Sequence, residues 1–164
     1  MRKKETDIRD VALRKLSHKA RTCGELETAL ISAGFSKEKI DKLIDEFKSL
    51  GYLDDVWYCM SFFEYGDRKG WADSRIIREL KNKGVSQNDL DDALEKLGKE
   101  LNDRVRALEV ALKMADVEDL EDSGRLKEKT KGRIARRLYG YGYSSDRIFA
   151  TIQLLEEELN SEKD

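Results

Sequence analysis

The chain of 164 residues contains no proline, two cysteines and one histidine. The absence of proline removes the commonest helix breaker and favours long uninterrupted helices. The two cysteines, Cys23 and Cys59, fit no metal-binding spacing such as C-x-x-C. We interpret them as small buried hydrophobes in a reducing cytosol. The single histidine, His18, leaves little material for a catalytic triad or a His-rich metal site.

Long apolar runs are also missing. No run approaches the ~20 residues that span a bilayer, and the charged start Met1–Arg9 precedes no apolar signal-peptide core. We therefore expect a cytoplasmic protein that makes no membrane contact. Neither a G-x-x-x-x-G-K-[ST] loop nor a G-x-G-x-x-G turn after a strand is present. The acidic run Asp116–Asp122 lacks the glycine and spacing of a calcium loop. We expect no enzymatic activity and no cofactor.

Charge is abundant but unevenly distributed. Charged residues make up 40% of the chain and hydrophobic residues 39%, and the net charge is −2. The segment Ser123–Arg147 nevertheless carries a local charge of +6, whereas Asp116–Asp122 holds five acids. Modest apolar content arranged at helical spacing is typical of an elongated helical array.

The strongest feature of the sequence is an internal repeat. Three segments align without gaps on a glycine, and each has apolar residues eight and four positions before it and one, six and ten positions after it. The three aligned glycines are Gly34, Gly84 and Gly142, separated by 50 and 58 residues. A repeat of this length indicates stacked copies of one small structural unit.

Each repeat predicts a helix, a tight turn and a second helix. Apolar residues four apart lie on one helix face. Glycine supplies the left-handed residue that ends a helix, and the following Phe35, Val85 or Tyr143 can pack back on the turn. The next residue is always serine, which can cap the second helix; the three serines are Ser36, Ser86 and Ser144.

A further helix is predicted before each pair. In the first copy its apolar stripe includes Ala12; in the second, Asp54 or Asp55 can cap a helix that includes Cys59 and Phe63. In the third copy, the stripe is Leu101, Val105, Leu108, Leu112 and Ala115. No segment alternates with the period of a strand. The sequence therefore predicts an all-α fold of about nine helices, an elongated curved array of three helix-turn-helix-like modules covering residues 6–53, 54–101 and 102–160.

The middle helices differ in charge. Those of the second and third modules carry basic residues opposite their apolar stripes: Arg75, Arg78, Lys81, Arg133, Arg136 and Arg137. At the positions of Arg75 and Arg78, the first module has Glu25 and Thr28. A charged helix face is most often simply solvated. Here the following helices are acidic, and this separation of sign favours a surface that selects a polyanionic or acidic partner.

Aromatic residues near these helices allow two interpretations. The turn Gly66–Trp71 could offer charge and a stacking platform, or Trp71 could simply close a small core. Tyr139 and Tyr141 pose the same choice beside the basic segment, and we expect them to be surface contacts. The helix that contains Trp57, Tyr58, Phe62 and Phe63 is aromatic nearly all round, which favours a buried central position over a partner groove.

The order of these features resembles a known family. The segment Gly51-Tyr52-Leu53-Asp54-Asp55 is followed by an aromatic-rich helix, then by Arg68-Lys69-Gly70 and by Arg75-Ile76-Ile77-Arg78-Glu79-Leu80-Lys81-Asn82-Lys83-Gly84-Val85. This order is similar to the central pattern of RecX proteins. The flanks Ala12–Leu16 and Arg136–Leu138 also resemble that family, so the likeness spans roughly residues 8 to 155.

The resemblance implies a monomeric, non-enzymatic regulator that binds the RecA recombinase and the RecA–single-stranded DNA filament. It implies inhibition of ATP hydrolysis and strand exchange during DNA repair and control of the SOS response. The candidate contact residues carried onto this chain are Arg68, Lys69, Trp71, Arg75, Arg78, Lys81, Lys83, Arg133, Arg136, Arg137 and Tyr139. The chain departs from the family in its mildly acidic charge and in Trp71, and the first departure argues more against direct DNA binding than against RecA binding.

Two alternatives remain from the residues alone. A stand-alone DNA-binding protein could use its helix–turn–helix elements as base readers. The segment Lys37–Ile44 lacks asparagine and glutamine for reading bases, and Asn88–Leu94 is acidic, which counts against this role. A helical-repeat adaptor for another protein is the second alternative.

Overall fold

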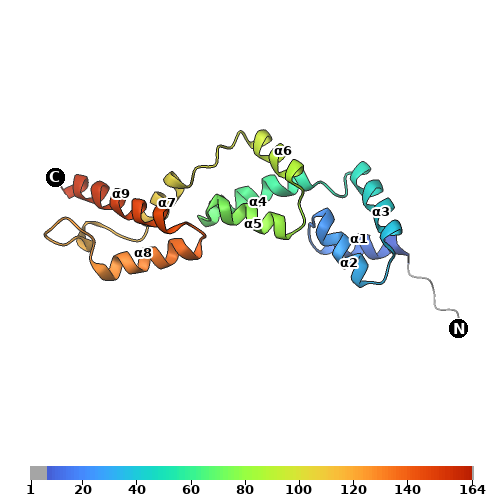
Figure 1. Cartoon of the computed structure of the whole chain (residues 1–164), viewed down its shortest axis with the longest axis horizontal. Helices are drawn as coiled ribbons and strands as arrows, with labels where there is room; N and C mark the ends of the chain where they lie inside the picture. Colours follow the sequence, from blue (N-terminus) through green and yellow to red (C-terminus); the bar gives the residue numbers. More distant parts are fainter. Residues whose placement is uncertain (1–6, 164) are drawn as a thin grey trace. The chain divides into compact units, whose positions relative to one another are not determined.

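A computed structural model of the chain describes residues 7–163, and in this range the fold is all-α. Residues 1–6, which include the predicted start of the first module, lie outside the described part. Figure 1 shows the helices in chain order: α1 (Ile8–His18), α2 (Cys23–Ser32), α3 (Lys37–Ser49), α4 (Asp55–Lys69), α5 (Asp73–Asn82), α6 (Gln87–Leu97), α7 (Asp103–Leu112), the short 3-10 helix η1 (Val117–Asp119), α8 (Glu128–Gly140) and α9 (Ser145–Lys163).

The all-α prediction is confirmed, with nine α-helices in the described residues. The β-structure in these residues is a single isolated antiparallel bridge between Leu120 and Leu126. Within residues 7–163, no helix combines the length and apolar character needed to cross a bilayer.

The glycine turn has the same geometry in all three repeats. Gly34, Gly84 and Gly142 have φ angles of 90°, 79° and 93°, the left-handed region expected of them. The backbone N–H of the residue after each glycine donates to the carbonyl of the leucine that lies four residues before the glycine, at 3.2, 3.2 and 3.1 Å in the three repeats. This is the closing bond of a Schellman motif.

The serine caps are equivalent in position but not in every bond. The Ser86 hydroxyl accepts from the Asp89 N–H at 3.1 Å, and the Ser144 hydroxyl accepts from the Arg147 N–H at 3.3 Å. Ser36 occupies the N-cap of α3 without a side-chain cap bond. At α4, Asp54 accepts from the Trp57 N–H at 2.8 Å, which confirms the predicted cap.

The chain forms two compact units. The first contains residues up to Phe62 together with Glu79–Lys99, and the second contains Phe63–Arg78 and Glu100–Asp164. Helices α4 and α5 therefore contribute residues to both units. The predicted module boundaries remain a prediction.

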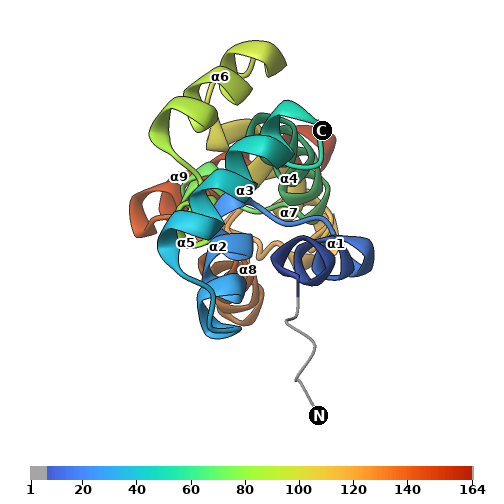
Figure 2. The ribbon, with the colours of Figure 1, turned by 90° about the vertical axis from the view of Figure 1, so that its right-hand side faces the viewer.

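Each unit has its own apolar core. In the first, α1, α2 and α3 pack together (Figure 2), and Leu26, Leu30, Ile40 and Phe47 are fully buried. In the second, α7, α8 and α9 surround a core that includes Leu126, Ile134, Leu138, Leu155 and Leu159. Both cores are lined by the apolar stripes that the repeat predicts.

A junction between repeats lies inside the first unit. The Thr22 hydroxyl, just before α2, donates to the carbonyl of Lys83, the residue after α5. The Cys23 N–H donates to the Asp55 carboxylate at 2.9 Å. A Cβ placed on Gly24 would lie 2.7 Å from the Cα of Gly84. The first turn of one middle helix thus packs directly on the glycine turn of the next repeat.

The second unit contains an equivalent junction. The Ala72 N–H, at the position of Thr22, donates to the Tyr141 carbonyl at 2.9 Å. The Asp73 N–H donates to the Asp103 carboxylate at 2.8 Å, as Cys23 does to Asp55. A Cβ on Gly142 would lie 2.7 Å from the Cβ of Arg75. The repeat therefore extends from local turns to tertiary contacts.

Two expectations about individual helices are wrong. The segment Gly66–Lys69 is not a turn: it continues α4, and Gly66 is buried where a Cβ would meet the Ile76 side chain at 2.5 Å. In the third module, Leu101 precedes α7 and Val105 is 59% exposed. The buried residues of α7 are Ala107 and Ala111, because small side chains let this helix approach α9 closely.

The aromatic helix is only partly the buried spine that its composition favours. Phe63 is fully buried and Cys59 beside it is too, whereas Tyr58 and Phe62 are half-buried. Trp57 is 58% exposed. The helix therefore has one exposed aromatic side.

Candidate functional site

Basic side chains from three helices surround one hollow in the second unit, which we call the basic pocket. It has a volume of about 300 Å³ and is formed by the end of α4, the end of α7 and the last turn of α8. Its lining includes Arg68, Lys69, Arg106, Lys113 and Arg137, against the acids Asp67 and Glu109. The excess of positive charge suits an anionic group on a partner.

Local structure explains why Arg68 and Lys69 lie at this edge. Helix α4 ends at Lys69, Gly70 has a φ of 75°, and the Trp71 N–H donates back to the Gly66 carbonyl at 2.9 Å. A Cβ on Gly70 would lie 2.6 Å from a methyl of Val110 on α7. The glycine therefore allows the end of α4 to lie against α7.

Arg106 has a structural role at the base of the basic pocket. Its guanidinium contacts the carboxylates of Asp73 and Asp67 at 2.9 Å each and that of Asp103 at 3.5 Å. Burial lowers the pKa of Arg106, but the hydrogen bond and charge of Asp73 outweigh this and raise it overall. Burial is also the main cause of a raised pKa at Asp103. The exposed positive charge of the pocket thus comes from its rim.

The rim combines cations with aromatic rings. The Arg137 guanidinium lies 5.6 Å from the centre of the Tyr141 ring and donates to the Tyr141 hydroxyl at 3.3 Å. The Lys69 ammonium lies 5.6 Å from the Tyr65 ring. Arg68, Lys69, Lys113 and Arg137 are all exposed. They can present charge to a macromolecule without the cost of desolvating a buried ion.

Arg75 and Trp71 take part in the junction of the second unit. The Arg75 guanidinium stacks 3.9 Å from the centre of the Trp71 ring and donates to the Gly140 carbonyl at 2.7 Å. The Tyr65 ring packs edge-on against Trp71, with 5.4 Å between the ring centres. The half-buried indole supports the interpretation that it closes a small core.

The other predicted contacts of the second unit are separate from the basic pocket. Arg133 donates to the Met114 carbonyl at 2.5 Å and lies 4.0 Å from the Asp119 carboxylate. Arg78 is exposed on α5. Arg136 and Tyr139 lie together at a groove between α8 and α9. Tyr139 is therefore a surface residue, as expected, whereas Tyr141 is half-buried.

Lys81 and Lys83 belong to the first unit. Lys81 is exposed, whereas Lys83 is half-buried, with its ammonium 3.2 Å from the Glu25 carboxylate and 5.8 Å from the centre of the Phe62 ring. Burial lowers the Lys83 pKa, but the hydrogen bond to Glu25 is among the contacts that raise it overall. Lys83 therefore supports the first junction.

Comparisons with known proteins agree with one another. A model of the first three-helix domain of RecX matches residues 9–47. The crystal structure of RecX from Lactobacillus salivarius superposes with a TM-score of 0.68 over 91% of this chain and 94% of that one, at 25% identity. A second RecX crystal structure, at 20% identity, has the same fold with a TM-score of 0.62 over 89% of this chain and 70% of that one.

Curated relatives point the same way. Proteins named regulatory protein RecX are 29% identical over 86% of this chain in Pseudomonas fluorescens and 28% identical over 87% in Corynebacterium efficiens. The chain covers 86% and 70% of those two proteins. The relative in Finegoldia magna is 37% identical over 54% of this chain, which is 43% of its own length.

The chain is thus similar to RecX proteins along most of its length. These comparisons agree with the resemblance that the central pattern carries, and the RecX crystal structures agree with the all-α fold.

Sequence reasoning missed three charged residues that line the basic pocket: Arg106, Glu109 and Lys113. All three lie on or just after α7, where the predicted stripe matches the buried face only in part. They recur three and four positions apart and so share one helix side, opposite the buried Ala107 and Ala111.

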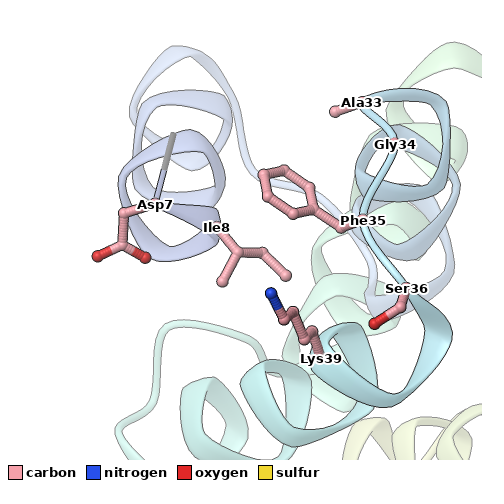
Figure 3. Close-up of a pocket in the computed structure, with 7 residues that line it drawn as sticks. All are labelled: Asp7, Ile8, Ala33, Gly34, Phe35, Ser36 and Lys39. Atoms are coloured by element: carbon pink, nitrogen blue, oxygen red, sulfur yellow. The ribbon is translucent and has the colours of Figure 1, made fainter. Parts of the chain in front are cut away.

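A second hollow, in the first unit, lies between the start of α1 and the first glycine turn. Figure 3 shows Ile8, Phe35 and Lys39 converging there, with Asp7 on its outer side. Phe35 also packs against the core, as the repeat predicts. With one lysine and one aspartate in its lining, this hollow lacks the charge excess of the basic pocket.

The two cysteines are held as neutral thiols. Burial is the main cause that raises the pKa of Cys23 to about 12, and the charge of Asp55 adds to it. Burial also raises the pKa of Cys59 to about 12. Because the thiolate is the reactive form, both cysteines have a packing role.

Proposed function

We propose that this chain is a regulatory protein of the RecX family, which binds RecA and the RecA–single-stranded DNA filament. In this role it inhibits ATP hydrolysis and strand exchange and so restrains recombination during DNA repair and the SOS response. It would act in the cytoplasm, as a monomer, without enzymatic activity of its own. The curated RecX relatives, which are named regulatory proteins, support this role.

The observation that carries the proposal is the convergence at the basic pocket. Arg68 and Lys69 are separated from Arg137 by almost seventy positions in sequence, yet all three line one hollow. The family resemblance marks the same three residues as contacts. Lys113 adds a fourth exposed cation. We therefore assign the pocket as the main electrostatic contact with acidic RecA surfaces or with the DNA backbone in the filament.

The remaining candidate residues divide by their contacts. Arg78, Lys81, Arg136 and Tyr139 are exposed and are proposed as direct partner contacts. Trp71, Arg75 and Lys83, with Arg133, make internal contacts that hold the scaffold. Exposed charges at the rim of the basic pocket speed up association with an oppositely charged partner, and salt screens this attraction. These charges should therefore affect mainly the rate at which the protein binds the filament.

The proposal is tested by RecA ATP hydrolysis on single-stranded DNA with substoichiometric amounts of this protein. The parent should inhibit, and Arg68→Glu/Lys69→Glu/Arg137→Glu should weaken inhibition about tenfold or more, because three attractive charges become repulsive. The matched control is Arg14→Glu/Lys39→Glu/Lys96→Glu, which changes net charge equally at exposed positions of the first unit.

Two outcomes would contradict the proposal. If the parent leaves ATP hydrolysis unchanged at any ratio to RecA, the regulatory role is wrong. If the pocket variant and the control inhibit equally, the site assignment is wrong. Tight duplex binding by the parent with no effect on RecA would instead favour a stand-alone DNA-binding protein.

A further inference from the structure

The groove between α8 and α9 differs from its counterparts in the other two repeats. It has a volume of about 450 Å³, its floor includes Ile148 and Ile152, and two large aromatic side chains form its walls. Those side chains, Tyr139 and Phe149, are 74% and 65% exposed. Exposed aromatic groups around an aliphatic floor mark an interaction site more often than a plain surface.

The same place in the first repeat is closed by ion pairs. Lys37 stands at the position of Ser145, and its ammonium bridges the carboxylates of Glu27 at 2.5 Å and Asp41 at 2.8 Å. Glu27 and Asp41 stand where the third repeat has Ala135 and Phe149. The repeat unit therefore folds well with polar groups at these positions.

The second repeat is also polar there. Lys81 replaces Tyr139, and Asp91 replaces Phe149 and accepts a hydrogen bond from the Gln87 side chain at 2.8 Å. Stability of the helix–turn–helix unit thus does not require aromatic residues at these two positions. The third repeat alone therefore carries large exposed aromatic side chains at positions where the packing of the unit does not call for them.

The residues that line the groove indicate which kind of group can bind there. Its lining is mostly aliphatic and aromatic, and the charge at its edge is the Arg136 guanidinium. That guanidinium reaches back along α8: a Cβ on Gly132 would lie 3.5 Å from its Nη1, so the glycine leaves room for it. An apolar side chain would fill the floor, and a neighbouring carboxylate would meet Arg136.

We propose that this groove receives a large apolar side chain flanked by acidic residues on a helical segment of a protein partner. The inference rests on the proposed function, because the partner engaged there is RecA. Nucleic acid fits less well, since bases stacked on Tyr139 and Phe149 would need a row of cations for their phosphates. The groove would add an apolar contact to the electrostatic one at the basic pocket.

The test variant is Tyr139→Lys/Phe149→Asp, which gives the third repeat the residues that the second repeat already has. It should fold like the parent, as circular dichroism and urea unfolding can check. The matched control is Ile31→Lys, since Ile31 is 52% exposed at the position equivalent to Tyr139 in the first repeat.

The first measurement uses the protein without RecA. Two short synthetic helical peptides carry the same leucine and tryptophan anchors, flanked by glutamates in one and by lysines in the other. The glutamate peptide should shift the methyl NMR signals of Ile148 and Ile152 and bind at least about fivefold tighter than the lysine peptide. The double variant should lose these shifts, and Ile31→Lys should keep them. Absent shifts, or equal binding of the two peptides, would overturn the proposal whatever happens with RecA.

The second measurement is inhibition of RecA ATP hydrolysis. The double variant should be weaker than the parent by about fivefold or more, and Ile31→Lys should match the parent. Full inhibition by the double variant would overturn the assignment of RecA as the occupant. If the parent itself fails to inhibit, the proposed function fails, and the peptide measurement still decides the chemistry of the groove.

Discussion

At the scale of single residues, the glycine of each repeat has two separable roles. All three aligned glycines adopt the left-handed conformation that ends a helix. Gly84 and Gly142 also lie against the middle helix of the preceding repeat, whereas a Cβ on Gly34 would meet no atom of the described residues within 4 Å. Within residues 7–163 no other repeat packs against Gly34, so there this glycine meets only the conformational requirement.

This difference predicts unequal costs for the same substitution. Gly34→Ala should lower the free energy of unfolding by about 1 kcal/mol, the cost of placing a Cβ in the left-handed region. Gly84→Ala should cost at least about 1 kcal/mol more, because its Cβ would lie 2.9 Å from the Cα of Gly24. Urea unfolding of both variants measures the difference, and equal costs would show that the junction is not tightly packed.

The repeated turn was predictable from sequence because local chemistry determines it. Glycine conformation and serine capping depend on neighbours within a few residues, as at Gly84 and Ser86. The contact of Gly84 with Gly24 was not predictable, because nothing in the spacing of either glycine indicates its partner. The buried role of Asp55 was missed for the same reason: it resembles a first-turn acid but accepts from Cys23.

At the scale of elements, α7 shows how a stripe can mislead. Its leucine and valine positions repeat at helical spacing, yet the residues buried against the core are Ala107 and Ala111. Small side chains permit close approach to α9, and the larger ones are left at the sides. Hydrophobicity alone ranks leucine above alanine, so the predicted stripe includes Leu108, which packs against the core, but misses the two fully buried alanines.

The packing of α7 predicts a strong size limit. Ala111→Leu should lower the free energy of unfolding by about 1–3 kcal/mol, because the site is fully buried and the added atoms must displace neighbours. Val105→Leu, on the same helix at a 59% exposed position, should change it by less than about 0.5 kcal/mol. Thermal or urea unfolding compares them. Similar effects of the two would place the buried face of α7 elsewhere.

At the scale of the whole molecule, the sequence predicts the class of fold and the family better than the site. The all-α fold follows from the pattern within each repeat, and the RecX resemblance follows from the order of segments between Gly51 and Val85. The basic pocket does not, since Arg68, Lys113 and Arg137 come from three helices whose packing the spacing leaves open. Of the basic residues that share a helix face in sequence, Arg75 is used internally and Arg136 borders a different groove.

The most direct test of the central claim, that the basic pocket binds the RecA–DNA filament, is the salt dependence of that binding. Affinity of the parent for the filament should fall steeply as salt rises. In Arg68→Glu/Lys69→Glu/Arg137→Glu, affinity at low salt should drop and its dependence on salt should become clearly shallower, because the attractive charges are gone. An unchanged affinity and an unchanged salt dependence in this variant would contradict the account.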